Sequence, residues 1–471
     1  MKPNLLFIFT DQQRSDTLAC YGNTHVQAPN LNALADQSFV FEHPYVTEPI
    51  CTPARSTIMT GLYPHTTGCI SNNIPLKPET PTLAEMVSSD YRTAYMGKWH
   101  LGNEIIAQHG FDEWVGTEEQ YRAYYSKDEY LEVLSPSHHF LIENGFTPEK
   151  ESEGKTVFSR PHAASLPEPY TKATYTGQQA ARFIHENKDQ PFVLYINFLE
   201  PHSPYFGPFN DMYPPEELPT GPQFMEYPAP NTSQHARDKA ERFNPKNLES
   251  GQGEMFQQIN TDGHDLSAEA GWRRIRARYM GLVTLVDKAV GNILTALDES
   301  GQADNTIVVF TSDHGDQMGD HHMLAKSVFY QESTQVPLFM RVPGLAGRQI
   351  PGRISQIDLV PTLLDLLGEP IPDGLQGQSR VDVLKGEATL DQNDAFFEWT
   401  DPDDPWRCIA SSEGWKLNLS PTDQCEFYDL NTDPYEQKNL YDDPSQQDRI
   451  QDLTDRIRRW QEQTNDPLPT I

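Results

Sequence analysis

Residues 192–198 read FVLYINF, a short and nearly continuous run of β-branched and aromatic side chains. Two similar runs lie far from it in the chain, LLFIF at 5–9 and IVVF at 307–310. Apolar runs of this length are typical of strands that are covered on both faces, as in the parallel sheets of α/β proteins. These three segments therefore predict the central strands of one buried sheet.

Helical patterns lie between these runs. The clearest spans residues 276–299, where apolar side chains recur at helical spacing and Gly301 follows as a stop. Strands that alternate with helices indicate a layered α/β domain whose site lies at the carboxyl ends of the strands. We predict this domain for residues 1–370, with two long irregular insertions near 118–180 and 205–270.

The pattern changes beyond about residue 370. Four short strand-like segments follow, AFFEWT (395–400), RCIAS (407–411), WKLNLS (415–420) and CEFYDL (425–430), and then a polar amphipathic helix near 445–463. Short strands followed by a helix are typical of an α+β unit. We predict a smaller C-terminal α+β subdomain over residues 371–471.

The composition restricts the partners and the compartment. The 471 residues carry a formal charge of −32, which repels nucleic-acid phosphates and anionic membranes, so we expect neither as a partner. The five cysteines are odd in number and irregularly spaced, which argues against a disulfide framework and a structural zinc site. The N-terminal apolar run is too short for a signal peptide, so we expect a cytoplasmic protein, or a periplasmic or secreted one if the sequence has been trimmed.

Polar side chains follow each of the three runs. Asp11 and Gln12 follow the first, His202 comes soon after the second, and Asp313 and His314 follow the third. Carboxylate and amide oxygens with one imidazole suit Ca²⁺, Mg²⁺ or Mn²⁺ better than structural zinc. Alternatively, each aspartate merely caps the helix that follows it.

Two further segments carry cations. Lys98 and His100 are two residues apart in YMGKWH, so in an extended segment both project to the same side. A lysine and a histidine on one side can bind an anion and move a proton. Lys326, in HHMLAK, is another candidate, although a lone lysine is more often a solvated surface charge.

The segment PICTPARSTIMTG at 49–61 contains Cys51, Pro53 and Arg55 in the Cys-x-Pro-x-Arg spacing. This motif resembles that of the type I sulfatases in the alkaline phosphatase superfamily. The resemblance continues through most of the chain, in segments listed here: DYRTAYMGKWH (90–100), GFDEWVG (110–116), FLEPHSPY (198–205), TSDHGDQMGDHHMLAK (311–326), QIDLVPTLLDLLG (356–368) and EFYDLNTDPYEQKNL (426–440). It implies a large, mixed but mostly parallel sheet sandwiched by helices, with the smaller C-terminal subdomain.

The resemblance also implies a chemistry. In these sulfatases a maturation enzyme oxidises the motif cysteine to formylglycine, whose hydrate attacks the sulfur of a sulfate ester near one divalent cation. Carried onto this chain, the metal ligands are Asp11, Gln12, residue 51, Asp313 and His314, with Ca²⁺ expected first and Mn²⁺ or Mg²⁺ as alternatives. The remaining roles fall to Arg55 (holding the formylglycine hydroxyl), Lys98 and Lys326 (sulfate oxygens), His100 (proton acceptor) and His202 (facing the leaving oxygen). Gln12 and His314 depart from the carboxylate and asparagine of the best-known arylsulfatases, as in carbohydrate sulfatases and phosphonate monoester hydrolases.

Three functions follow from these motifs. The first is a sulfatase that acts on a small sulfated substrate, a sugar or oligosaccharide, in an exo-acting manner. The second is a phosphonate monoester or phosphodiester hydrolase with the same aldehyde and metal. The third is a non-catalytic binder of sulfate esters whose Cys51 is never converted. Tyrosines in or beside the first insertion, Tyr121, Tyr124, Tyr125, Tyr170 and Tyr175, either stack on sugar rings or simply pack; the sequence gives no oligomeric state.

Overall fold

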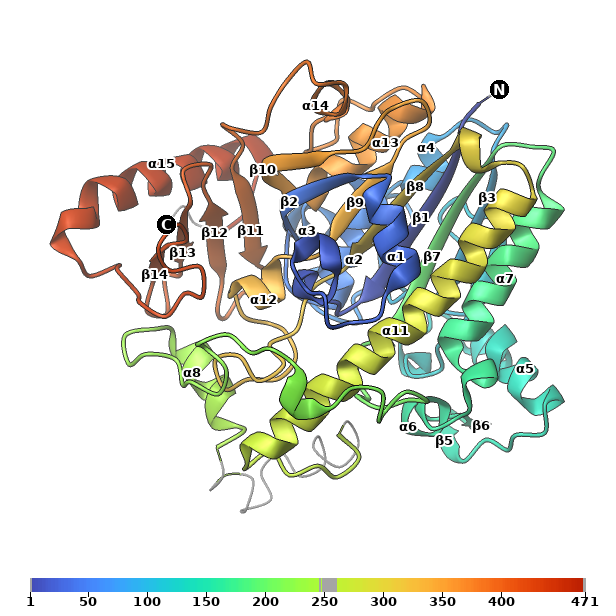
Figure 1. Ribbon diagram of the computed structural model, residues 1–471. Helices are drawn as coiled ribbons and strands as arrows, with labels where there is room; N and C mark the ends of the chain where they lie inside the picture. The colour runs from blue at the N-terminus through green and yellow to red at the C-terminus, as the bar shows by residue number, and fades with distance from the viewer. Residues whose placement is uncertain (1, 245–246, 248–260, 469–471) are drawn as a thin grey trace.

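An eight-stranded sheet forms the centre of the molecule in the computed structural model, which describes residues 2–244, 247 and 261–468 (Figure 1). The strands lie in the order β10-β2-β9-β8-β1-β7-β3-β4. Their bounds are β1 Asn4–Asp11, β2 Phe39–Tyr45, β3 Arg92–Gly97, β4 Glu113–Gly116, β7 Phe192–Pro201, β8 Thr306–Ser312, β9 Leu338–Arg341 and β10 Gln349–Ser355. Only β9 runs antiparallel to its neighbours within this sheet, so the predicted mixed, mostly parallel sheet is confirmed.

The three apolar runs of the sequence form adjacent strands. β1 lies between β7 and β8 and pairs in parallel with both, with Ile8 opposite Ile196 on one side and Phe310 on the other. Because alternate residues of a strand face opposite sides, each of these strands supplies both layers of the core. Leu6 and Ile8 face one layer, and Leu5 and Phe7 face the other.

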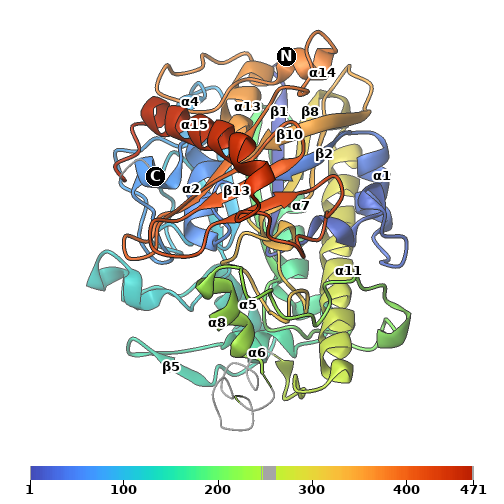
Figure 2. The ribbon, with the colours of Figure 1, turned by 90° about the vertical axis from the view of Figure 1, so that its left-hand side faces the viewer.

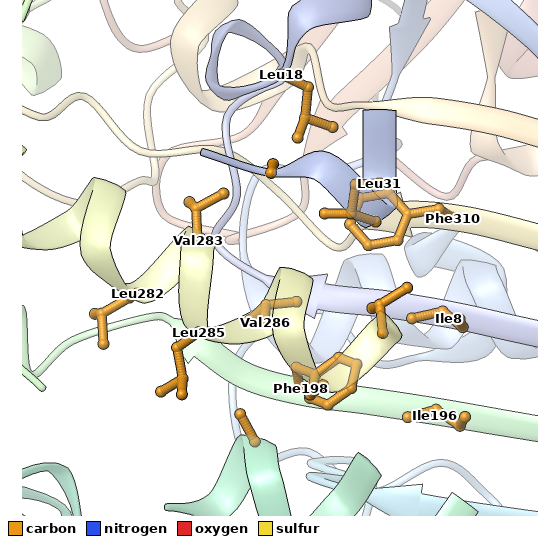
Figure 3. Close-up of a cluster of buried hydrophobic side chains, with 14 of the residues drawn as sticks. Ile8, Leu18, Leu31, Ile196, Phe198, Leu282, Val283, Leu285, Val286 and Phe310 are labelled. Atoms are coloured by element: carbon orange, nitrogen blue, oxygen red, sulfur yellow. The ribbon is translucent and has the colours of Figure 1, made fainter. Parts of the chain in front are cut away.

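Helices cover both faces of the sheet. One face packs against α1 (Pro29–Asp36), α7 (Lys172–Glu186) and α11 (Glu269–Glu299); Figure 3 shows Val286 of α11 beside Phe198 of the sheet. The other face packs against α2 (Cys51–Thr60), α4 (Leu83–Met86) and α13 (Leu359–Leu367). Short helices α3 (Pro64–Thr67), α12 (Gln331–Thr334) and α14 (Val381–Lys385) lie in the connections.

A second, four-stranded antiparallel sheet follows in the C-terminal part. It consists of β11 Ala395–Trp399, β12 Trp406–Ala410, β13 Trp415–Leu419 and β14 Glu426–Asp429, and α15 (Gln447–Thr464) packs against it (Figure 2). All four predicted strands and the terminal helix are therefore present. The large sheet ends at Ser355 and the small one begins at Ala395, whereas the domain boundary at 370 stays a prediction.

The predicted insertions contain more structure than their composition indicates. The first holds α5 (Pro136–Glu143), the hairpin of β5 (Lys150–Ser152) and β6 (Lys155–Val157), α6 (Arg160–Ala164) and the start of α7. The second holds α8 (Gln234–Glu241), and part of this prediction lies outside the described residues. The expectation of irregular chain was wrong for the start of α7, whose buried face is built partly from Ala173, Gly177 and Ala180, small residues that add little apolar surface.

The long helix α11 begins seven residues earlier than the pattern predicted, because Trp272 and Ile275 extend its buried face. By length and composition it is apolar enough to cross a membrane, but 72% of its apolar window is buried inside this fold. Its apolar character is thus explained by packing on the sheet and on α7.

Candidate active site

The polar side chains that follow the central strands converge at one edge of the sheet. Asp11 is the last residue of β1, Asp313 directly follows β8, and Cys51 is the first residue of α2. All three are buried. The structure does not show the alternative in which the aspartates only cap helices. Asp11 accepts hydrogen bonds from the side chains of Arg55 and Lys98. Asp313 accepts hydrogen bonds from the Arg55 side chain and from the backbone N–H of Gln12.

Asp11, Cys51, Asp313 and His314 form a compact donor group. Their candidate ligand atoms all lie within 4.8 Å of one another. His314 Nε2 lies 3.7 Å from Asp11 Oδ1, 3.5 Å from Asp313 Oδ1 and 3.2 Å from Cys51 Sγ. His314 Nδ1 lies 3.0 Å from the Gly315 carbonyl oxygen, which can only accept, so Nδ1 carries a hydrogen and Nε2 is the nitrogen that faces the group.

Arg55 holds the two carboxylates from the side away from His314. Its Nη2 donates to Asp11 Oδ2 at 2.8 Å and its Nε donates to Asp313 Oδ2 at 2.9 Å. Each aspartate therefore keeps its Oδ1 toward the imidazole. Burial alone would raise the pKa of Asp11, but the neighbouring side chains of Lys98, His202 and Arg55 hold this pKa well below its usual value. A buried carboxylate pair with one imidazole nitrogen fits a divalent cation.

Gln12 is placed differently from the other expected ligands. It adopts a left-handed backbone conformation with φ of 74°, and its side-chain Oε1 accepts a hydrogen bond from Lys326. Its Nε2 donates to the Tyr205 hydroxyl at 2.8 Å and to Asp316. The side-chain amide of Gln12 thus links Lys326 to the site. The role of Gln12 as a metal ligand stays a prediction.

Lys98 and His100 both face Tyr121. The Lys98 ammonium lies 5.5 Å from the centre of the tyrosine ring, and the His100 ring stacks on it with centroids 3.8 Å apart. The reason given for their common side was wrong: β3 ends at Gly97, and His100 has a φ of 58°, so this segment is not extended. The tertiary fold, and not strand alternation, brings the two side chains together.

The protonation of His100 suits a proton acceptor. Its Nε2 lies 2.9 Å from Asn73 Oδ1 and donates to it, while Nδ1 is buried without a hydrogen-bond partner among the described residues. Burial and the charges of Lys98 and Arg55 lower its pKa well below the usual value. His100 is therefore neutral near pH 7, with a free lone pair on Nδ1.

His202 is half-buried, and its Nδ1 donates to the Ser203 carbonyl oxygen at 2.7 Å. Burial and the charge of Lys326 lower its pKa well below the usual value. The neutral ring therefore carries a lone pair on Nε2, and it must gain a proton there before it can donate one. His202 and Asp11 each influence the pKa of the other, which places His202 near the same site.

The Cys51 thiol lies in an electropositive environment. Burial and Asp11 raise its pKa, whereas the charges of Lys326, Lys98 and His314 lower it, and the net pKa is about 7. The structure thus places all ten predicted site residues in or beside one buried cluster, with Lys326 at its partly exposed rim.

Comparisons with known proteins agree with this geometry. The family model described as Sulfatase matches residues 3–369, and the model described as N-sulphoglucosamine sulphohydrolase, C-terminal, matches residues 319–463. The chain belongs to the sulfatase family. It is 30% identical to the ulvan-active sulfatase of Formosa agariphila over 94% of this chain and 78% of that protein. By this membership it is a hydrolase of sulfate esters.

Solved structures show the same fold for this sulfatase. The phosphonate monoester hydrolase SpPMH from Silicibacter pomeroyi has a TM-score of 0.79 and 24% identity, and the match covers 99% of this chain and 96% of that one. BT4656, solved in complex with its substrate D-glucosamine-2-N,6-O-disulfate, has a TM-score of 0.75 and 23% identity, covering 100% and 99%. The predicted α/β fold with a separate small C-terminal sheet is confirmed.

Several residues of the sulfatase site were missed by the sequence analysis. Asn197 of β7 accepts from Arg55 Nη1 at 3.1 Å and donates to the Phe9 carbonyl oxygen at 3.1 Å. Asn197 is the polar residue within the otherwise apolar strand FVLYINF. A polar residue in a buried apolar strand is a sequence signal that would have indicated a site residue here. Asn73 and Asp316 carried no such signal, because only the fold places them beside His100 and Gln12.

A second carboxylate and histidine group joins the C-terminal part to α3. His65 Nδ1 lies 2.7 Å from Glu398 Oε2, and Arg407 donates to both oxygens of Asp466. The candidate donor atoms of His65, Glu398 and Asp466 lie within 4.8 Å of one another. Because Arg407 already supplies a positive charge to Asp466 and lies 3.7 Å from Glu398 Oε2, we interpret this group as a buried ion-pair network.

Proposed function

We propose that this chain hydrolyses the sulfate ester of a small sulfated substrate, a sugar or oligosaccharide, with a formylglycine derived from Cys51 and one divalent cation. The observation that carries this proposal is the position of Cys51, which starts α2 beside the donor group of Asp11, Asp313 and His314. The formylglycine hydrate would supply the hydroxyl that attacks sulfur, and the cation would favour its ionised form.

The residues of this chain hold and polarise the anion. Lys98, which is buried beside Asp11, and Lys326, at the partly exposed rim, supply positive charge with which they would bind the sulfuryl oxygens. Arg55 is committed to Asp11 and Asp313, so its main role is to fix these carboxylates. His100 would accept a proton at Nδ1 after the ester is cleaved. His202 would donate a proton to the leaving oxygen only once its Nε2 is protonated, which a bound anion near Lys326 favours.

Residues of both insertions lie beside the site, which supports a small substrate or the terminal residue of a longer one. Tyr121 and Arg160 of the first lie against the Lys98 and His100 segment, with the Arg160 guanidinium donating to the Tyr121 hydroxyl at 2.8 Å. His235 of the second bonds to the carbonyl oxygen of Ser327, next to Lys326. One face of Tyr121 is covered by His100, so of its two expected roles packing is the one observed. The exo mode and the cytoplasmic location stay predictions, to be checked by end-group analysis and cell fractionation.

The rival functions differ in measurable ways. A phosphonate or phosphate diester is also a tetrahedral anion and would meet the same cations, so geometry alone does not separate it from a sulfate ester. The test is to co-express the chain with a formylglycine-generating enzyme, verify residue 51 by mass spectrometry, and compare kcat/KM for matched aryl sulfate, phosphonate monoester and phosphodiester substrates. A Cys51→Ala variant is the control.

We expect the sulfate ester to be hydrolysed fastest and the Cys51→Ala variant to be inactive. Faster turnover of the phosphonate would favour the second function. Unconverted Cys51 in protein from its own host, with binding but no turnover, would favour the non-catalytic binder.

A further inference from the structure

Helix α8 lies against the loop that carries Lys326. Ala236 and Ala240 of the helix pack in one cluster with Met323 and Val328 of that loop, and His235 Nε2 donates to the Ser327 carbonyl oxygen at 2.7 Å. The helix is also tied to the C-terminal sheet, since the Ser233 amide donates to Glu426 Oε1 at 2.9 Å. Figure 1 shows α8 between the C-terminal part and the loops below the large sheet. α8 is thus a fixed wall of the site.

Lys239 projects from this wall without a carboxylate partner. It follows Ala236 by three residues and therefore lies on the same side of the helix, and it is half-buried. Other lysines in or near the core are paired, as in Lys98 with Asp11, Lys172 with Glu118 and Lys416 with Glu436. Within the part of the chain that the structure describes, Lys239 forms no such ion pair.

The charges around Lys239 are mostly positive. Burial, which is the largest cause, and the nearby charges of Lys326 and Arg242 together lower its pKa to about 7, while Asp316 opposes them. Asp316 is already engaged by Gln12 and Tyr205. Lys326 in turn donates to the neutral Gln12 amide and not to a carboxylate. Two neighbouring lysines, one on α8 and one at the rim of the donor group, therefore both lack an ion-pair partner among the described residues.

We propose that Lys239 binds a second anionic group of the substrate, a carboxylate or a further sulfate that lies beside the scissile ester. Lys326 would hold the scissile group and Lys239 would hold the second anion. Each anion would then supply the negative charge that its lysine lacks in the described part of the fold. This rests on the proposed function only in that the ligand is a sulfated sugar. It narrows the substrate class to sugars with at least two anionic groups.

Binding measurements in a Cys51→Ser background test this without turnover. The probes are glucosamine 6-O-sulfate, glucosamine 2-N,6-O-disulfate and a sulfated uronic acid, titrated calorimetrically into the metal-loaded protein. The variants are Lys239→Met, Lys239→Gln and the charge-retaining Lys239→Arg. Lys188→Met, which removes an exposed lysine, is the matched control. Thermal unfolding of each variant verifies that it is folded.

We expect the parent to bind at least one dianionic probe about tenfold more tightly than the monosulfated sugar, which corresponds to about 1.4 kcal/mol. Lys239→Met and Lys239→Gln should abolish this preference and leave the monosulfated sugar unaffected, whereas Lys239→Arg and Lys188→Met should retain it. The disulfated and uronic probes show which second anion is bound. A preference that survives in Lys239→Met, or a parent without any preference, would overturn the proposal. Failure of the proposed function would instead appear as a converted enzyme that does not hydrolyse sulfate esters.

Discussion

Arg55 Nε donates to Asp313 Oδ2 at 2.9 Å, and both side chains are wholly buried. The same guanidinium donates to Asp11 at 2.8 Å, so one arginine neutralises the two carboxylates that would hold the cation. The arginine of the Cys-x-Pro-x-Arg motif, Arg55, thus fixes the positions of the two carboxylates of the site. It lies one helical turn after Cys51 on α2, which places both residues on the same face of the helix.

Replacement of Arg55 should destabilise the metal-free protein strongly. Arg55→Met leaves two buried carboxylates without their partner, and loss of one partner from a buried ion pair costs about 3–5 kcal/mol. The free energy of unfolding, measured with denaturant in the presence of a chelator, checks this. Arg273→Met removes a partly exposed pair with Glu269 and should cost no more than about 1 kcal/mol. An equal effect of the two variants would contradict this reading of Arg55.

Asp313→Asn and His314→Gln should each abolish tight binding of one divalent cation. Each change removes a donor atom from the group, so the loss should exceed the roughly 10–100-fold that is typical of outer-shell partners. Calorimetric titration with Ca²⁺, Mn²⁺ and Mg²⁺ measures this, and Ca²⁺ is expected to bind in preference. Asp316→Asn is the outer-shell comparison, because this carboxylate accepts hydrogen bonds from Gln12 and Tyr205, and it should weaken binding by no more than roughly 10–100-fold. Unchanged affinity in Asp313→Asn would refute the ligand set.

His100→Gln should lower kcat by about 10²–10⁴-fold and change KM little, as expected on loss of a proton acceptor. Because the pKa of His100 is lowered by burial and by Lys98 and Arg55, its base form is lost only below that lowered value. The acid limb of kcat/KM should therefore lie below about pH 6.5. His185→Gln, which changes an exposed histidine of α7, should leave the rate and the limb unchanged. An acid limb of kcat/KM at a pH above the usual range of histidine pKa values would contradict the assignment of His100 as the proton acceptor.

The His65 network should make stability depend on pH. Burial lowers the pKa of His65, but the charge and hydrogen bond of Glu398 outweigh it and raise the pKa. A raised pKa in the folded state gives stabilisation that is fully present below about pH 6.5 and is lost as the pH rises through the folded value. Urea unfolding across this range should show the loss in the parent and not in His65→Gln. Parallel pH profiles for the two proteins would show that His65 does not contribute.

Much of the fold was predictable because short-range patterns carried it. The apolar runs around Ile8, Ile196 and Phe310 are too short for helices and too apolar for exposed strands, so adjacent buried strands were the natural interpretation. The same logic failed at the start of α7, where the buried positions follow helical spacing but include small residues such as Ala173 and Ala180, which carry little apolar surface. The same logic also failed at His100, because no local sequence pattern predicts the positive φ of this residue.

The sequence by itself determined the order of strands and helices, the residues at the strand ends and the Cys51 to Arg55 spacing. These properties depend on neighbours in the chain, which a linear pattern records. The tertiary structure alone decided that Arg55 bridges Asp11 and Asp313, that Tyr121 covers His100, and that Lys239 lies near Lys326. These contacts join segments far apart in the chain, and their charges act on one another only because folding buries them together, away from the screening of water.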